Sequence, residues 1–155
     1  MPQLVKGGKF VFGWTKVGNN GNIAIPPDAF SEYGFINGEN LILIAGSKTS
    51  GGFGLTKRET LKESRLFALL IGCPELTDFH IPAGTAIKYQ NRTYSWVLMK
   101  ENYFTLPPDT LALFGIKSGN RLLVVRGSGL ALGFIVRGPI VEEALKHPTV
   151  VEYGP

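Results

Sequence analysis

The sequence has little cysteine and no long apolar segment. Cys73 is the single cysteine among 155 residues, which excludes an intrachain disulfide framework. No apolar run approaches the roughly 18 residues that a membrane-spanning helix needs. The first ten residues, MPQLVKGGKF, lack the apolar stretch of a secretory signal. These absences predict a protein of the reducing cytoplasm that has no membrane segment.

The residues that carry most catalytic and metal chemistry are equally sparse. His80 and His147 have no second ligand at metal-binding spacing, and Cys73 is not part of a CxxC pair. Asp28 and Asp109 are the only carboxylates at matching positions of the repeat described below, and the dipole at a helix N-terminus accounts for both of them. We therefore expect no enzyme, no cofactor and no metal site.

Carboxylates are missing from two stretches of the chain. The formal net charge of +4 is modest, so the total alone says little about partners. No Asp or Glu precedes Asp28, and none lies between Asp78 and Glu101. Both stretches contain cations, which are Lys6, Lys9 and Lys16 in the first and Lys88, Arg92 and Lys100 in the second.

One phrase of sixteen residues occurs twice. IPPDAFSEYGFINGEN at 25–40 is echoed 81 positions later by LPPDTLALFGIKSGNR at 106–121. Without any gap, 25–56 and 106–137 are identical at ten positions. In the first copy these are Pro26, Pro27, Asp28, Gly34, Gly38, Leu41, Gly46, Ser47, Gly52 and Phe53. We interpret the echo as an internal duplication.

Each copy reads as short strands around one short helix. Twenty glycines and ten prolines without a collagen-like period indicate many turns. Pro-Pro-Asp is typical of a helix start, and Gly34 or Gly115 of the residue after a helix end. The expected strands are 10–17, 22–25, 41–46 and 52–56 in the first copy, and 93–99, 103–106, 122–127 and 133–137 in the second.

A further helix is expected after the fourth strand of each copy. Thr56-Lys57-Arg58-Glu59 reads as a capping box that starts a helix over 57–71, and a second helix covers 139–147. The predicted unit is therefore ββαββα. The division is a first unit at 1–72, a connection at 73–88, a second unit at 89–148, and a tail at 149–155 that adds one more strand.

The second copy carries a recognisable pattern. Leu106-Pro107, a short helix and Gly115-Ile116-Lys117-Ser118-Gly119-Asn120 resemble the SpoVT/AbrB superfamily, and Ile25-Pro26 opens the matching segment of the first copy. The resemblance covers roughly 10–56 and 92–137. It implies a mainly β fold with short helices, in which two tandem units form one pseudo-twofold swapped-hairpin β-barrel. A unit of this size has too little core to stand alone.

The resemblance also implies a function. Members of the superfamily bind DNA through basic residues of the first hairpins, so the expected protein is a transcriptional regulator that contacts duplex DNA. The residues at such places are Lys6, Lys9, Lys16, Asn22, Lys88, Arg92 and Lys100. With few arginines there, recognition would depend mainly on charge and DNA shape.

A second interpretation stays open. Where the family pattern has an arginine after glycine, this chain has Asn22 and Tyr103. The chain would then have kept the barrel, lost DNA binding, and act as an oligomerisation or protein-partner-binding module. Chains could associate further through the helices at 57–71 and 139–147. Trp14 and Trp96 lie 82 positions apart and are expected to pack in the core or between units.

Overall fold

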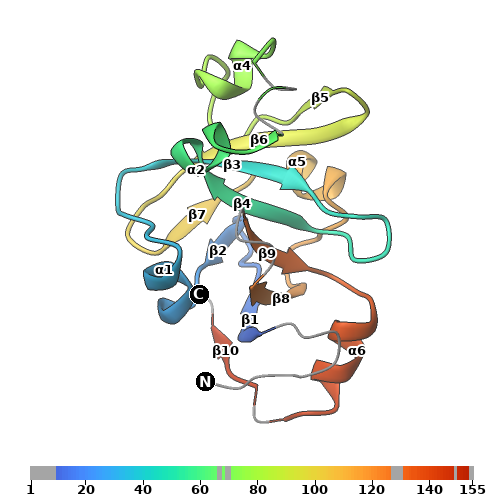
Figure 1. Cartoon of the computed structure of the whole chain (residues 1–155). Coiled ribbons are helices and arrows are strands. Elements are labelled where there is room, and N and C mark those ends of the chain that lie inside the picture. Colours follow the sequence, from blue (N-terminus) through green and yellow to red (C-terminus); the bar gives the residue numbers. More distant parts are fainter. Residues whose placement is uncertain (1–9, 66–67, 69–70, 127–130, 149, 154–155) are drawn as a thin grey trace.

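The computed structural model describes residues 10–65, 68, 71–126, 131–148 and 150–153, and within them the fold is mainly β with short helices (Figure 1). The strands are β1 Val11–Lys16, β2 Asn22–Ala24, β3 Asn40–Ala45, β4 Phe53–Lys57, β5 Ile87–Tyr89, β6 Arg92–Leu98, β7 Tyr103–Thr105, β8 Arg121–Arg126, β9 Leu132–Ile135 and β10 Glu152–Tyr153. The helices are α1 Pro27–Glu32, α2 Arg58–Lys62, α4 Pro74–Thr77, α5 Pro108–Leu113 and α6 Pro139–Leu145.

The strands form an open sheet. Eight of them are hydrogen-bonded in the order β10-β1-β8-β9-β4-β3-β6-β5, while β2 and β7 form a separate two-stranded ribbon. The expectation of a closed barrel is therefore wrong. Because β10 lies outside β1 and β5 lies outside β6, the ladder ends at these two short strands and does not close on itself. Neither added strand belongs to the ββαββα pattern.

The first strand of each half pairs with the third strand of the other half. In the β1–β8 pair Trp14 lies opposite Leu123, and in the β6–β3 pair Trp96 lies opposite Ile42. The two tryptophans therefore occupy matching positions, although they are 82 and not 81 residues apart. The difference arises in the connection after the first strand, which is 17–21 in one half and 99–102 in the other. Trp14 is buried and Trp96 packs against a buried cluster, so the packing role expected of them is confirmed.

The fourth strands match in a different register from the sequence echo. Ala45 lies opposite Phe53 in the β3–β4 hairpin, whereas Arg126 lies opposite Leu132 in the β8–β9 hairpin. The second connection is therefore two residues shorter than the first. Measured from β3 and β8, the partner of Gly133 in the other half is Gly54, not Gly52. The gapless match of Gly52 and Phe53 to the second copy is coincidental at this strand.

The main core contains residues from both halves. Phe53 of β4 stacks on Phe134 of β9 with ring centroids 4.9 Å apart, and Phe104 of β7 lies edge-on to both. All three rings are at most 2% exposed. Two smaller clusters lie under helices, one with α6 over β1 and β8 and one with α2 and α4 over β3 and β6. In Figure 1 these two groups of helices lie on opposite sides of the molecule.

The repeated phrase forms the helix that was expected of it. Both α1 and α5 have proline at the first position and aspartate in the first turn. Gly34 and Gly115 follow them with φ of +67° and +78°, a left-handed conformation that glycine adopts without a Cβ clash. The short helix that begins at Pro-Pro-Asp and is followed by a left-handed glycine is therefore confirmed in both halves.

The elements after the fourth strands differ from expectation. The capping box is wrong, because Thr56 is the buried fourth residue of β4 and Lys57 is the N-cap of α2, without a side-chain capping bond. Helix α2 ends at Lys62, so one continuous helix over 57–71 is also wrong. The predicted connection contains α4 and β5, which sequence periodicity did not indicate. The expected tail strand is present as β10, which runs parallel to β1.

Candidate nucleic-acid interface

The residues expected to contact DNA occupy several separate places. Lys6 and Lys9 lie outside the described residues. Lys16 is the last residue of β1 and Asn22 is the first of β2. The remaining three are Lys88 in β5, Arg92 at the start of β6, and Lys100 just beyond its end.

The structure does not gather them on one surface. Arg92 and Lys100 lie near opposite ends of β6, and a strand of that length separates them by about 25 Å. Lys88 lies opposite Thr93, and Tyr89 lies opposite Arg92, so Lys88 and Arg92 point to opposite faces of the β5–β6 hairpin. Between β1 and β6 the ladder places four other strands.

The described candidate cations share one electrostatic property. Lys16, Lys88, Arg92 and Lys100 are exposed, and among the described residues no carboxylate lies within ion-pair distance of them. Four other cations are paired, and these are Lys57 with Glu39, Arg58 with Asp78, Arg121 with Glu152, and Arg126 with Glu32. The exposed lysines Lys48, Lys62, Lys117 and Lys146 also have no carboxylate within ion-pair distance among the described residues. The unpaired group keeps its charge available for an external anion.

A hollow lies at the end of the first hairpin. Its volume is about 630 Å³, and its described lining is Lys16, Val17, Gly18, Asn19, Asn20 and Asn22. Gly21 fixes this hairpin against the second half, because its carbonyl accepts the Leu106 N–H with N···O 3.1 Å. The φ of Gly21 is +83°, and a Cβ there would stand 2.0 Å from the Leu106 oxygen. Only glycine fits, so the backbone on this side of the hollow is firmly placed.

The second half of the chain lies beside the residues that line the hollow. The Val17 N–H donates to the Asn120 carbonyl (N···O 2.9 Å), and the Gly119 N–H donates to the Val17 carbonyl (2.8 Å). Arg121 lies directly opposite Lys16 in the β1–β8 pair. The turn at 117–120 and the start of β8 therefore lie beside the end of β1.

Two cations beside the end of β1 were not identified from the sequence. Lys117 is exposed on the turn, where its N–H donates to the Asn120 side-chain oxygen (2.9 Å). The Arg121 guanidinium lies 4.4 Å from the centre of the Trp14 ring and 3.3 Å from a Glu152 carboxylate oxygen. Both residues are more than 100 positions from Lys16 in sequence. Only the pairing of β1 with β8 brings them together, and no local sequence pattern indicates that pairing.

Asn22 serves the contact between the halves. It lies opposite Thr105 in the β2–β7 ribbon, and the Thr105 hydroxyl donates to its side-chain oxygen at 2.7 Å. Its amide oxygen therefore already has a partner within the protein. This position joins the two halves in addition to lining the hollow.

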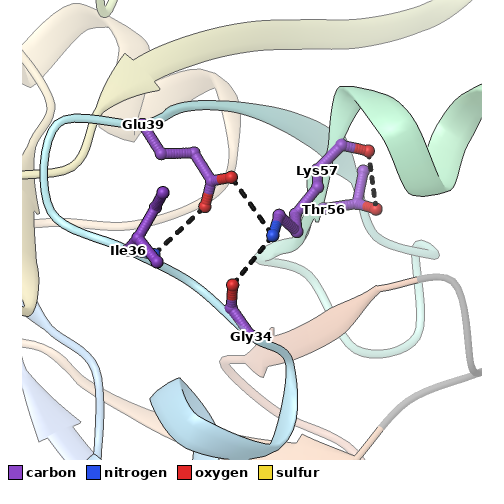
Figure 2. A network of polar contacts seen from close by, with 5 residues as sticks. All are labelled: Gly34, Ile36, Glu39, Thr56 and Lys57. Carbon is purple, nitrogen blue, oxygen red and sulfur yellow. Dashed lines mark hydrogen bonds and ion pairs between the residues drawn. The ribbon is translucent and has the colours of Figure 1, made fainter.

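The turn of the first half that corresponds to 117–120 is built differently, as Figure 2 shows. One Glu39 carboxylate oxygen accepts the Ile36 N–H (3.2 Å), and the other lies 3.3 Å from the Lys57 ammonium. Lys57 also donates to the Gly34 carbonyl at 2.8 Å. Here the charges are satisfied internally, in contrast to the turn that carries Lys117.

Other kinds of site find no support in the described part of the chain. No group of three or more His, Cys, Asp or Glu side chains there is placed to hold a metal ion. Among the same residues, no helix has both the length and the apolar character needed to cross a bilayer. Burial raises the pKa of the Cys73 thiol, and a hydrogen bond to Glu75 acts in the same direction, so this thiol is a poor nucleophile near neutral pH.

Comparison with known proteins adds no assignment. No family model, curated protein or solved structure matches the chain.

Proposed function

We propose that this protein is a DNA-binding transcriptional regulator of the AbrB-like type, which contacts duplex DNA through the cations of its first hairpins. The observation that carries the proposal is the exposed, unpaired state of Lys16, Lys88, Arg92 and Lys100, while several other cations pair with carboxylates. Phosphates supply most of the affinity of such proteins, and they require cations that are not already neutralised.

The strand pairing supports the family arrangement behind this proposal. In a pseudo-twofold swapped-hairpin fold each unit lends its first strand to the other unit, as β1 and β6 do here. Two residue pairs would lie on the twofold axis, because each consists of matching positions. These are Ile23 opposite Phe104 in the β2–β7 ribbon and Gly54 opposite Gly133 in the β4–β9 pair. The fold would thus be an opened, two-unit form of the swapped-hairpin barrel.

Recognition would then be mostly by charge and groove shape. Arg92 is the only arginine among the unpaired candidates, so bidentate contacts to guanine are few. Asn19 and Asn20, both exposed at the tip of the first hairpin, add neutral donors for phosphate oxygens.

Fluorescence anisotropy with a labelled DNA duplex of mixed sequence tests the proposal. Binding is expected at low salt and should weaken steeply between about 50 and 200 mM salt. The double variant Lys16→Ala, Arg92→Ala should bind more weakly than wild type. Lys62→Ala, Lys146→Ala removes the same charge from exposed helix positions and serves as the control. Absence of binding at low salt, or equal loss in both variants, would contradict the proposal.

A partner-binding module is the second candidate, and one observation favours it. Ile36 is 60% exposed and Leu98 is 40% exposed at the end of the molecule that corresponds to Lys117 and Lys16. Exposed apolar side chains that form a contiguous patch mark protein-interaction sites. Under this alternative the wild-type protein fails to bind the duplex and sediments as more than one chain.

A further inference from the structure

The exchange of first strands creates two ends with matching backbones. At one end the Gly119 N–H donates to the Val17 carbonyl (2.8 Å), and at the other the Gly38 N–H donates to the Met99 carbonyl (2.7 Å). The β2–β7 ribbon shows the same match between the halves. The Leu106 N–H donates to the Gly21 carbonyl, and at the matching place the Ile25 N–H donates to the Asn102 carbonyl. Apart from the one extra residue in the connection at 17–21, the differences between the ends therefore come from side chains.

The side chains at the two ends differ in charge. At the first end Lys16 is opposite Arg121, whereas at the second end Leu98 is opposite Asn40. Lys117 occupies the turn of the first end, and its counterpart at the second end is Ile36. The set at the first end is Lys16, Lys117, Arg121, Asn120, Asn19 and Asn20, and the set at the second end is Leu98, Ile36, Asn40, Glu39, Lys100 and Glu101.

The balance of charge follows directly. The first end has three cations and one carboxylate, Glu152, which forms an ion pair with Arg121. The second end has two carboxylates, Glu39 and Glu101, and two cations, Lys100 and the Lys57 that is paired with Glu39. A phosphate backbone would be attracted to the first end, whereas the charges of the second end balance.

We propose that the chain has a single polyanion-binding surface, formed by Lys16, Lys117 and Arg121 beside the hollow of the first hairpin, and that the partner is the phosphate backbone of a nucleic-acid duplex. This inference rests on the proposed function and restricts it, because the second hairpin then takes no part in binding. Lys16 and Lys117 reach the ligand directly. Arg121, held on Trp14 by its ring contact, sets the positive field between them.

The number of phosphate contacts sets how strongly the binding constant should depend on salt. Each neutralised phosphate contributes about −0.9 to the slope of log K against log salt, so the two lysines that reach the ligand directly give a slope of about −2. Lys16→Ala, Lys117→Ala should bring the slope close to zero. Lys62→Ala, Lys146→Ala removes the same charge from exposed positions outside the proposed surface and should leave the slope unchanged.

A gain-of-function variant tests the asymmetry itself. Ile36→Lys, Leu98→Lys gives the second end the cations of the first, and both positions are exposed enough to accept lysine. The slope should become steeper by about 1 to 2, since two new cations are offset in part by the nearby carboxylates. Ile36→Gln, Leu98→Gln removes the same apolar surface without adding charge, and it should match wild type.

The outcomes separate this inference from the proposed function. If wild type binds no duplex at low salt, the proposed function fails and the inference fails with it. If wild type binds, but Lys88→Ala, Arg92→Ala weakens binding as much as Lys16→Ala, Lys117→Ala does, the proposed function stands and the single surface is wrong. Circular dichroism of each variant confirms that the fold is retained before the slopes are compared.

Discussion

Gly21 shows how one residue determines the position of the candidate interface. Its positive φ and the nearby Leu106 oxygen leave no room for a Cβ. Gly38 has nearly the same φ, +86°, but nothing lies within 4 Å of its Cβ position. Comparing alanine substitutions at Gly38 and Gly21 therefore separates two contributions to stability. Gly38 reports the cost of the left-handed backbone alone, and Gly21 adds the cost of the clash with the Leu106 oxygen.

We expect Gly38→Ala to lower the free energy of unfolding by about 1 to 2 kcal/mol, the cost of a left-handed conformation in a residue with a Cβ. Gly21→Ala should cost roughly twice as much, because the β2–β7 ribbon must also shift. Urea denaturation of the two variants measures both values. Equal losses would mean that the ribbon yields easily and that Gly21 does not fix the hairpin.

At the same scale, sequence reasoning found some of the candidate site and missed the rest. Lys16 and Asn22 were identifiable because they flank a turn that local chemistry predicts. Lys117 and Arg121 were not, because their closeness to Lys16 depends on pairing between strands more than 100 residues apart. Long-range pairing leaves no periodic trace in a single sequence.

Among the elements, the strands and short helices of the repeated phrase were predictable, since prolines and glycines mark their ends. The helices and strands outside the repeated phrase were harder to predict from the sequence. The threonine and glutamate of Thr56-Lys57-Arg58-Glu59 fit a capping box, but burial of Thr56 in β4 overrides that local preference. The open form of the sheet was also beyond reach, because β5 and β10 are only three and two residues long.

The β2–β7 ribbon offers a test of how the two halves meet. Asn22 and Thr105 lie directly opposite each other, and such residues have Cα atoms about 4.5 to 5.5 Å apart, within disulfide range. Asn22→Cys, Thr105→Cys should therefore oxidise readily to a disulfide within one chain. Non-reducing electrophoresis and intact mass measure it.

Asn22→Cys, Tyr103→Cys is the matched control, because Tyr103 lies opposite Ala24 and is a diagonal neighbour about 7 to 8 Å from Asn22. It should oxidise slowly. A disulfide that forms only between two chains in the first variant would show that the strands are exchanged between molecules and not within one.

For the whole molecule, one ion pair outside the shared core joins the two halves. Glu32 at the end of α1 accepts two hydrogen bonds from Arg126 of β8, at 2.6 and 2.7 Å. The hydrogen bond from Arg126 is the main reason why the pKa of the Glu32 carboxyl lies below its usual value. The Arg126 guanidinium also lies 4.6 Å from the centre of the Phe10 ring.

A lowered carboxyl pKa stabilises the folded protein at pH values above the ordinary carboxyl pKa, and this stabilisation is lost as the pH falls through the folded value. Wild type should therefore unfold at a higher urea concentration than Glu32→Gln near neutral pH. The difference should shrink between about pH 5 and pH 3. Glu63→Gln, which removes a carboxyl at an exposed position, is the matched control. A gap between wild type and Glu32→Gln that stays constant with pH would contradict this account.

The pairing of β1 with β8 also governs how the chain can fold while it is being made. Val11 lies opposite Val125, which leaves the ribosome 114 residues later. At about 5 to 20 residues per second, the first strand waits roughly 6 to 23 seconds for its partner. During that interval the hydrophobic strand at Val11–Lys16 has no sheet to join. Synthesis of this protein thus leaves the strand without its sheet partner until Val125 has been made.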